Sequence, residues 1–178
     1  MANKTIKHYN MEKRIVTQKI TTNLWFNKQA EEAVNFYLSV FKNSRTGRST
    51  YYSKDGEIHG MPEGTLMTLE FELDGHPFVA LNGGPYFKFT EAVSFIVNCE
   101  NQEEIDYYWE RLTEGGDEKA QVCGWLKDKF GVSWQIVPTV LIDMLQDKDT
   151  EKTGRVMSAL LKTKKKIDLS ALEAAYGK

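Results

Sequence analysis

Hydrophobic residues follow the same pattern twice along the chain. Residues 20–26 have the apolar character of a strand, and helical spacings of three and four follow through residues 30–41. Far downstream, apolar residues alternate over 92–99, and helical spacing returns over 105–112. The chain therefore predicts an internal repeat in which each copy begins with a strand and a helix. The N-cap candidates of the two helices are Asn27 and Asn101, the second with Glu104 three residues on.

Antiparallel strands are expected after the first helix. Residues 48–52 predict a short strand, and apolar and polar side chains alternate over residues 66–73. Asp74-Gly75 is the strongest hairpin signal in the sequence, so residues 78–82 are predicted to form the returning strand.

The second copy is predicted to be one strand shorter. Its strands are expected over residues 122–127 and 133–137, unless residues 118–121 supply another. The two copies, residues 20–85 and 92–138, predict an α+β fold in which two half-sheets close side by side around a cleft.

The segments on either side of the repeat differ from it in character. Residues 1–19 are polar and basic without an apolar centre, so they predict a flexible leader rather than a secretory signal. Residues 139–178 predict a helical tail, with Asp149 and Asp168 as N-cap residues. The apolar stripe over residues 156–161 is expected to pack on the main domain or on a partner subunit, because such a stripe is unstable in water.

The composition is that of a folded globular chain. Hydrophobic residues make up 41% of the 178 residues, and the net charge of −2 argues against a nucleic-acid binder. No apolar run approaches the ~18 residues that a membrane span needs. Cys99 and Cys123 lie in apolar stretches and predict buried, reduced thiols in a cytoplasmic protein. The lysines within residues 162–166 are interpreted as a solvated helix end, because lysine complements the helix dipole there.

Four stretches of the sequence carry a resemblance to a known family. They are residues 24–37, 68–75, 80–85 and 124–138. In this order they are similar to the PhnB-like proteins, also called the 3-demethylubiquinone-9 3-methyltransferase domain, of the vicinal-oxygen-chelate superfamily. The resemblance covers about residues 20–176. It implies paired βαβββ modules that form a cupped mixed sheet, usually in a homodimer.

The methyltransferase name would imply S-adenosylmethionine as a cofactor. Binding of that cofactor usually involves a glycine-rich loop between a strand and a helix in a parallel α/β layout. Gly83-Gly84-Pro85 instead follows a hairpin strand and precedes no capped helix, so we interpret it as a tight turn between the modules. We therefore expect no cofactor.

The resemblance also implies a divalent metal, held by His, Glu or Gln on the first and last strands of each module. Those positions fall at Ile20, Ala80, Val93 and Gln135, give or take about two residues. Gln135 alone carries a ligand atom, so we expect no metal site. His59, in a loop between strands, is left open as a lid residue.

Strand alternation, counted from these metal positions, predicts a mostly apolar small-molecule pocket with a few polar groups. The residues expected to contact the ligand are Thr22, Leu24, Phe26, Asn82, Phe95, Trp125 and Gln135. Trp25 and Trp134 are expected to point the other way, beneath the helices. Glu70 and Glu72 are interpreted as a solvated face, with a role in lining the cavity as the alternative.

These observations favour a metal-independent small-molecule binding protein of the glyoxalase/bleomycin-resistance type. Such a protein would sequester an apolar or aromatic ligand. The alternative is a metal-dependent enzyme of the same superfamily that acts on a substrate with vicinal oxygens. The two functions differ in the number of metal-ligating atoms expected at the four metal positions. The single such atom, in Gln135, favours the binding protein.

Overall fold

The computed structural model describes Ile15 and residues 18–178, apart from the side chains of Ile58 and His59. The chain divides into two compact units, Met1–Lys88 and Phe89–Lys178, which are described separately. Most of the predicted leader, and the predicted lid role of His59, lie outside the described residues. Within the described part of the chain, no helix is both long and apolar enough to cross a membrane.

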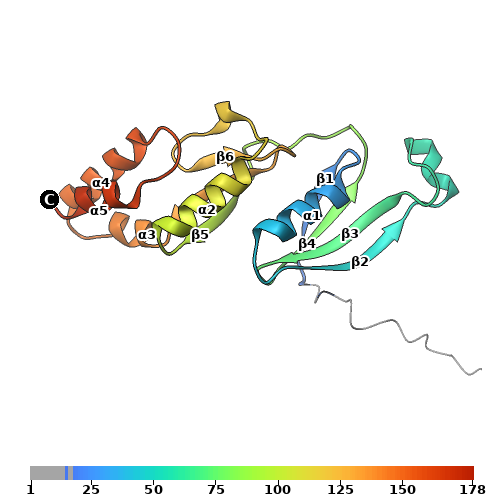
Figure 1. Cartoon of the computed structure of the whole chain (residues 1–178), viewed down its shortest axis with the longest axis horizontal. Coiled ribbons are helices and arrows are strands. Elements are labelled where there is room, and N and C mark those ends of the chain that lie inside the picture. The colour runs from blue at the N-terminus through green and yellow to red at the C-terminus, as the bar shows by residue number, and fades with distance from the viewer. Residues whose placement is uncertain (1–14, 16–17) are drawn as a thin grey trace, which may run out of the picture. The chain divides into compact units, whose positions relative to one another are not determined.

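Unit 1 is a four-stranded mixed sheet with a helix across one face (Figure 1). Its elements are β1 (Thr22–Phe26), α1 (Ala30–Val40), β2 (Arg45–Tyr51), the 3-10 helix η2 (Lys54–His59), β3 (Leu66–Leu73) and β4 (His76–Asn82). The strand order is β1-β4-β3-β2, with β1 parallel to β4 and the other pairs antiparallel. The predicted hairpin is confirmed, because Asp74 and Gly75 have φ angles of 46° and 79°, the positive values of a type I′ turn.

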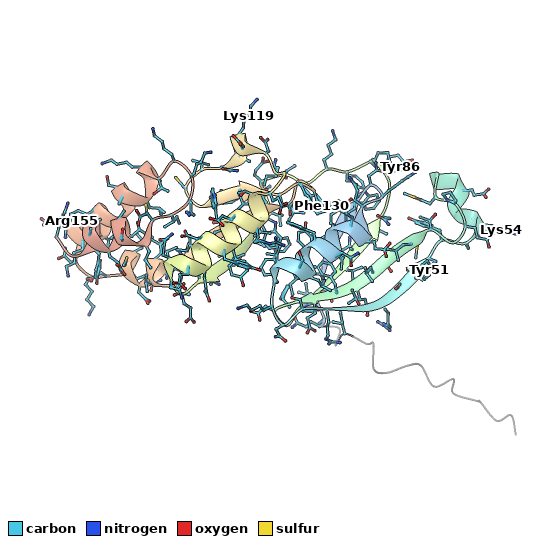
Figure 2. The ribbon with its side chains drawn as sticks, in the orientation of Figure 1. Tyr51, Lys54, Tyr86, Lys119, Phe130 and Arg155 are labelled. Atoms are coloured by element: carbon cyan, nitrogen blue, oxygen red, sulfur yellow. The ribbon has the colours of Figure 1, made fainter. Side chains whose placement is uncertain are left out.

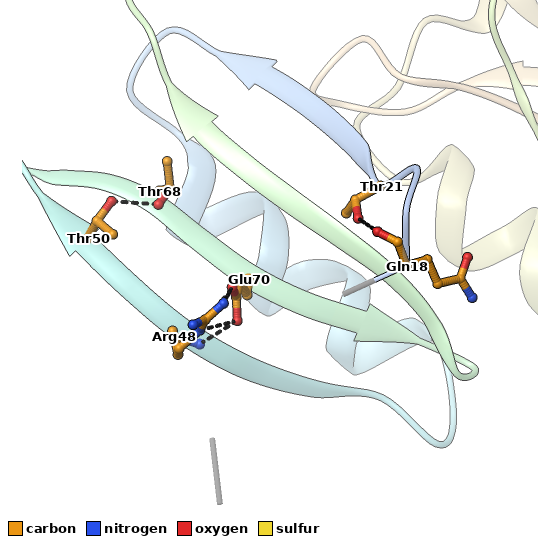
Figure 3. A network of polar contacts seen from close by, with 6 residues as sticks. All are labelled: Gln18, Thr21, Arg48, Thr50, Thr68 and Glu70. Atoms are coloured by element: carbon orange, nitrogen blue, oxygen red, sulfur yellow. Dashed lines mark hydrogen bonds and ion pairs between the residues drawn. The ribbon is translucent and has the colours of Figure 1, made fainter. Parts of the chain in front are cut away.

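Strand alternation divides this sheet into a covered face and an open face. Helix α1 packs on β3 and β4, and beneath it Phe71 stacks on Phe78 at 5.0 Å and on Tyr37 at 6.4 Å between ring centroids. The open face carries the polar residues of β3 and β2. Figure 3 shows two of their contacts, the Arg48–Glu70 ion pair and the Thr50–Thr68 hydrogen bond.

Unit 2 is a three-stranded mixed sheet followed by a helical tail. Its elements are β5 (Phe95–Cys99), α2 (Gln102–Thr113), the 3-10 helix η3 (Glu118–Ala120), β6 (Trp125–Lys127), β7 (Ser133–Pro138), α3 (Val140–Leu145), α4 (Thr150–Lys162) and α5 (Leu169–Tyr176). The strand order is β5-β7-β6, one strand fewer than in unit 1, as the sequence predicted. The predicted N-cap of α2 is confirmed, because Asn101 accepts a hydrogen bond from the Glu104 N–H at 2.9 Å.

The helical tail packs within unit 2 around its own apolar cluster. Leu141, Met144, Val156, Ile167 and Leu172 form this buried cluster. The predicted N-caps of α4 and α5 are confirmed: an oxygen of each aspartate accepts backbone N–H bonds, from Glu151 and Lys152 in one case and from Ser170 and Ala171 in the other.

The segment between α4 and α5 joins the tail to the sheet and to α2. Thr163 and Lys165 accept backbone hydrogen bonds from Cys123 and Gly124, just before β6. The Lys166 ammonium lies 2.6 Å from an Asp106 oxygen of α2. Lys166, one of the lysines within residues 162–166, therefore helps to attach the tail to α2.

Candidate functional site: an aromatic pocket in unit 1

An open pocket of about 710 Å³ lies at one end of the unit 1 sheet. Its lining residues are Trp25, Tyr52, Leu81, Gly83, Tyr86 and Phe87. Strand directions explain why they meet: β1 is parallel to β4, and both β2 and β4 are antiparallel to β3. The strands β1, β2 and β4 therefore all end on the same side, where Trp25, Tyr52 and the segment after β4 lie. Figure 2 shows Tyr86 toward this end of the unit.

The indole of Trp25 is held in place from three sides. Its Nε1–H donates to the Gly84 carbonyl at 2.9 Å. The Phe87 ring meets it edge to face, with 4.8 Å between centroids and 78° between planes. A Cβ atom at Gly83 would lie 2.3 Å from a carbon atom of the indole ring, so any larger residue at this position would displace the ring. The indole is thus a fixed wall of the pocket.

Tyr52 contributes a second oriented ring. Its hydroxyl donates to the Asn82 carbonyl oxygen at 2.7 Å. The polar atoms of both Trp25 and Tyr52 are therefore bonded to the backbone at the end of β4. What the two side chains offer a ligand is the apolar and π surface of their rings.

The structure corrects the expected direction of Trp25. Leu24 and Phe26 are buried, at 5% and 3% exposure, on the face that α1 covers, so Trp25 between them lies on the open face. The prediction counted strand alternation from Ile20. This residue precedes β1 and is 86% exposed, so its position does not set the direction of the strand residues.

Asn82 also lies on the covered face and has a structural role there. Its side-chain Oδ1 accepts the Ala30 N–H at 2.9 Å, and its Nδ2 donates to the Leu66 carbonyl at 3.1 Å. The predicted N-cap of α1, Asn27, is wrong: Gln29 is the N-cap and makes no side-chain cap bond. The acceptor for the free N–H of Ala30 at the helix start is the Asn82 side chain in β4. Thr22, two residues before Leu24, is half-buried.

In unit 2, two of the predicted contact residues share the open face of the sheet. Trp125 of β6 is paired with Gln135 of β7, and both are half-buried. The Gln135 amide donates to the Ser94 hydroxyl at 2.9 Å. Two residues from Gln135 along β7, the Ser133 hydroxyl is buried and has no hydrogen-bond partner among the described residues.

Phe95 lies on the opposite face from Gln135. In the parallel pairing of β5 and β7 it is in register with Trp134, and the two rings lie 5.2 Å apart. The expected position of Trp134 is confirmed, since it is 3% exposed in the layer next to α2. The Trp134 indole donates to the buried Asp128 carboxylate at 2.9 Å. Ligand contact remains a prediction for all seven residues named from the sequence.

The two glycines after β4 do not form an anion-binding loop. The Gly83 N–H donates to the Phe26 carbonyl at 2.9 Å, and the Gly84 N–H donates to the Asn27 carbonyl at 3.1 Å. Backbone amides that cradle a phosphate point at the ligand instead. These two amides are used to join the ends of β1 and β4.

The expected metal positions carry few donors. Ala80 is fully buried on the covered face, and Ile20 and Val93 lie outside the strands at 86% and 72% exposure. Among the side chains that the structure describes, which exclude that of His59, no three His, Cys, Asp or Glu gather closely enough to hold a metal ion. The Glu70 carboxylate of the open face is paired with Arg48, which holds its pKa below the ordinary value.

The two cysteines differ in their surroundings. Cys99 is fully buried in β5, and burial raises the pKa of its thiol to about 12. Cys123 is half-buried in a turn, at a φ of 50°, and its sulfur lies 3.1 Å from the Thr163 carbonyl oxygen. Burial was expected for both and is confirmed for Cys99. Neither thiol is disulfide-bonded.

Tyr52, Leu81, Tyr86 and Phe87 were not predicted as site residues. Sequence alternation alone does not reveal them, because Tyr86 and Phe87 lie in the loop after β4 and Tyr52 follows β2. The available signal was topological: three strands that end on one side bring the residues after them together.

Comparisons with known proteins agree on the family and the fold. Residues 18–137 match the family model described as 3-demethylubiquinone-9 3-methyltransferase. The solved structure of the PhnB protein from Bacillus cereus is 38% identical to the chain, with a TM-score of 0.60. This match covers 68% of the chain and 100% of the Bacillus protein. The comparison with curated proteins finds no match.

More distant structures share the fold. The fosfomycin resistance protein FosX from Listeria monocytogenes is 15% identical, with a TM-score of 0.51, over 74% of this chain and 99% of FosX. A mutant of FosX, solved with Mn(II) and a dihydroxypropylphosphonic acid, is 15% identical with a TM-score of 0.50, over 71% of this chain and 95% of that one.

Proposed function

Because the chain belongs to the 3-demethylubiquinone-9 3-methyltransferase (PhnB-like) family of the vicinal-oxygen-chelate superfamily, we propose that it is a metal-independent small-molecule binding protein. The observation that carries the proposal is the aromatic pocket of unit 1, with its fixed Trp25 indole. A concave site lined mainly by apolar and aromatic side chains is the usual setting for a small organic ligand.

The size and chemistry of the pocket support this class of ligand. A volume of about 710 Å³ lies in the range of pockets that enclose whole small molecules. Since the polar atoms of Trp25 and Tyr52 are bonded to the backbone, the walls bind by burial of apolar surface and by ring contacts. The ligand is therefore an apolar or aromatic organic molecule.

Unit 2 supplies a second set of candidate contacts. Trp125 and Gln135 lie side by side on its open face, and the buried Ser133 hydroxyl is unpaired among the described residues. A buried hydroxyl without a partner is unfavourable, so a ligand group that bonds Ser133 would be stabilised. We propose that these three residues provide polar and aromatic contacts, while Leu24, Phe26, Asn82 and Phe95 support the sheets from their covered faces.

The donor chemistry does not fit the metal that the superfamily implies. The open face of unit 1 has carboxylates in Glu70 and Glu72, and each is paired with an arginine. In unit 2, Gln135 offers one neutral amide, which already bonds Ser94. Hard and borderline divalent cations require several oxygen or nitrogen ligands together. A metal titration separates this proposal from its alternative, a metal-dependent enzyme.

We further propose that the protein acts as a homodimer in the cytoplasm. Large apolar side chains remain exposed in the described chain, with Val93 at 72% and Ile96 at 56%, and a second copy would cover such residues. Two unpaired thiols are consistent with a reducing compartment. Size-exclusion chromatography with light scattering should give a mass of twice 20.4 kDa; a mass of 20.4 kDa at micromolar concentration would contradict the dimer.

The binding function is tested with a neutral aromatic probe, N-phenylnaphthylamine, which fluoresces when it leaves water. Chelator-treated protein should bind it saturably, and Phe87→Leu should weaken binding about fivefold or more, because one aromatic wall of the pocket is lost. Tyr51→Leu is the matched control: Tyr51 is equally exposed but does not line the pocket, so affinity should stay unchanged. Equal affinities of both variants and the wild type would contradict the proposed site.

A further inference from the structure

The pocket of unit 1 presents aromatic rings from three separate segments of the chain. Trp25 is the next-to-last residue of β1, and Tyr52 directly follows β2. Tyr86 and Phe87 lie in the loop after β4. Trp25 and Phe87 stand nearly perpendicular, at 78°, and so form two adjoining walls. Aromatic rings attract a cation to their faces without any formal charge.

The described lining of this pocket offers no cationic side chain to an anion. No lysine or arginine belongs to the described residues that line it. In the segments that follow β1, β2 and β4 and border it, residues 27–29, 53–63 and 83–88, the three acids Asp55, Glu57 and Glu63 are balanced by three lysines, Lys28, Lys54 and Lys88. The acid-rich segment packs against the pocket wall, since a Cβ atom at Gly56 would lie 2.7 Å from the Tyr52 ring.

The pocket suits a cation that needs few hydrogen-bond acceptors from the protein. The indole N–H is a donor only, and the Tyr52 hydroxyl donates its proton to the backbone, so its oxygen is the one acceptor that these two side chains offer to an ammonium ion with several N–H donors. A methylated ammonium has apolar methyl groups, which share its charge and need no acceptor. Aromatic rings bind such groups by cation–π attraction together with burial of the methyl groups.

We propose that this pocket binds an organic cation that carries a methylated ammonium group, with the group held by the four aromatic rings. The inference rests on the proposed function and adds a cationic, methylated head group to the organic ligand proposed there. Tyr86 and Phe87 are 67% and 66% exposed, so their rings have surface left to bury against such a ligand. The pocket volume leaves room for a body attached to the cationic head.

The test compares choline with dimethylbutanol, the neutral isostere in which a carbon atom replaces the charged nitrogen. Titration followed through the Trp25 indole N–H resonance should give choline an affinity about tenfold above that of dimethylbutanol. Phe87→Leu and Tyr86→Leu, at exposed positions that do not threaten the fold, should each remove most of this preference. Tyr51→Leu should keep it.

Each outcome decides the inference. Equal or stronger binding of dimethylbutanol would overturn it, because the charge would then contribute nothing. Absence of choline binding up to tens of millimolar, a range in which weak cation–π sites are detectable, would overturn it as well. If N-phenylnaphthylamine still binds the wild type more tightly than Phe87→Leu in these cases, the proposed function stands and the cationic ligand class alone has failed.

Discussion

The side-chain oxygen of Asn82, the last residue of β4, accepts the backbone N–H of Ala30, the first residue of α1, at 2.9 Å. The same residue's amide group donates to the Leu66 carbonyl, and its own carbonyl accepts the Tyr52 hydroxyl. One asparagine thus joins the helix start, the β3 strand and the pocket wall. The covered core and the open pocket depend on each other through this residue.

Replacing Asn82 should therefore destabilise unit 1. In Asn82→Leu the Ala30 N–H and the Leu66 carbonyl lose their partners in a buried site, and the free energy of unfolding should fall by about 2 to 4 kcal/mol. Asn23→Leu, at an exposed position of β1, is the control and should change it by less than about 0.5 kcal/mol. Urea unfolding measures both. A loss below about 1 kcal/mol in Asn82→Leu would show that the bonds contribute little.

Two glycines should respond in opposite directions to alanine. Gly83→Ala forces the Trp25 ring from its place, so the free energy of unfolding should fall by about 1 to 3 kcal/mol and the Trp25 indole N–H resonance should move. Gly154 lies within α4 with open space around it, so Gly154→Ala should raise the free energy of unfolding by about 0.5 to 1 kcal/mol. Equal effects of the two substitutions would contradict the close contact at Gly83.

The Cys99 thiol should be inert in the folded protein. Its pKa is raised to about 12 by burial, so the reactive thiolate is nearly absent at pH 8, and the side chain is fully buried. In a Cys123→Ala variant, which leaves Cys99 alone, the thiol-specific reagent DTNB should react only after denaturant is added. Reaction at the rate of a free thiol at pH 8 without denaturant would contradict this.

The Arg48–Glu70 ion pair should contribute stability that depends on pH. Hydrogen bonding from Arg48 lowers the pKa of Glu70 from its ordinary value of 4.5. A carboxylate with a lowered folded pKa contributes fully above that ordinary value and loses the contribution as the pH falls through the folded one. Glu70→Gln should therefore be less stable than the wild type at pH 7, by a fraction of a kcal/mol as for other surface pairs.

The measurement for this pair is urea unfolding of both proteins between pH 7 and pH 3. The difference between wild type and Glu70→Gln should shrink toward zero as the pH falls below 4.5. A difference that stays constant across this range would show that the pair does not couple proton binding to folding.

Local patterns in the sequence predicted the elements well. The hairpin at Asp74-Gly75, the caps at Asn101, Asp149 and Asp168, and the shortened second sheet all follow from residues next to one another in the chain. Each of these signals has a local physical cause, a positive φ or an acceptor beside free N–H groups. The α+β class with a helical tail followed from them.

The face assignments failed where they depended on long-range register. The Trp25 prediction assigned Ile20 and every second residue after it to the cavity, but Leu24 and Phe26 of this set lie on the covered face. The direction of Phe95 is set by its pairing with Trp134. A shift of one residue turns every side chain of a strand to the other face. The pocket depends further on which strands run in the same direction, and no short segment of sequence specifies that.

The central claim, a metal-independent small-molecule site around Trp25, is tested most directly by the indole N–H resonances of the four tryptophans in chelator-treated, ¹⁵N-labelled protein. Titration with N-phenylnaphthylamine should move the Trp25 resonance saturably and leave the Trp134 resonance, in the buried layer under α2, in place. Mg²⁺ and Zn²⁺ alone should move neither. A Trp25 resonance that ignores the probe, or a saturable shift that requires a metal, would contradict the account.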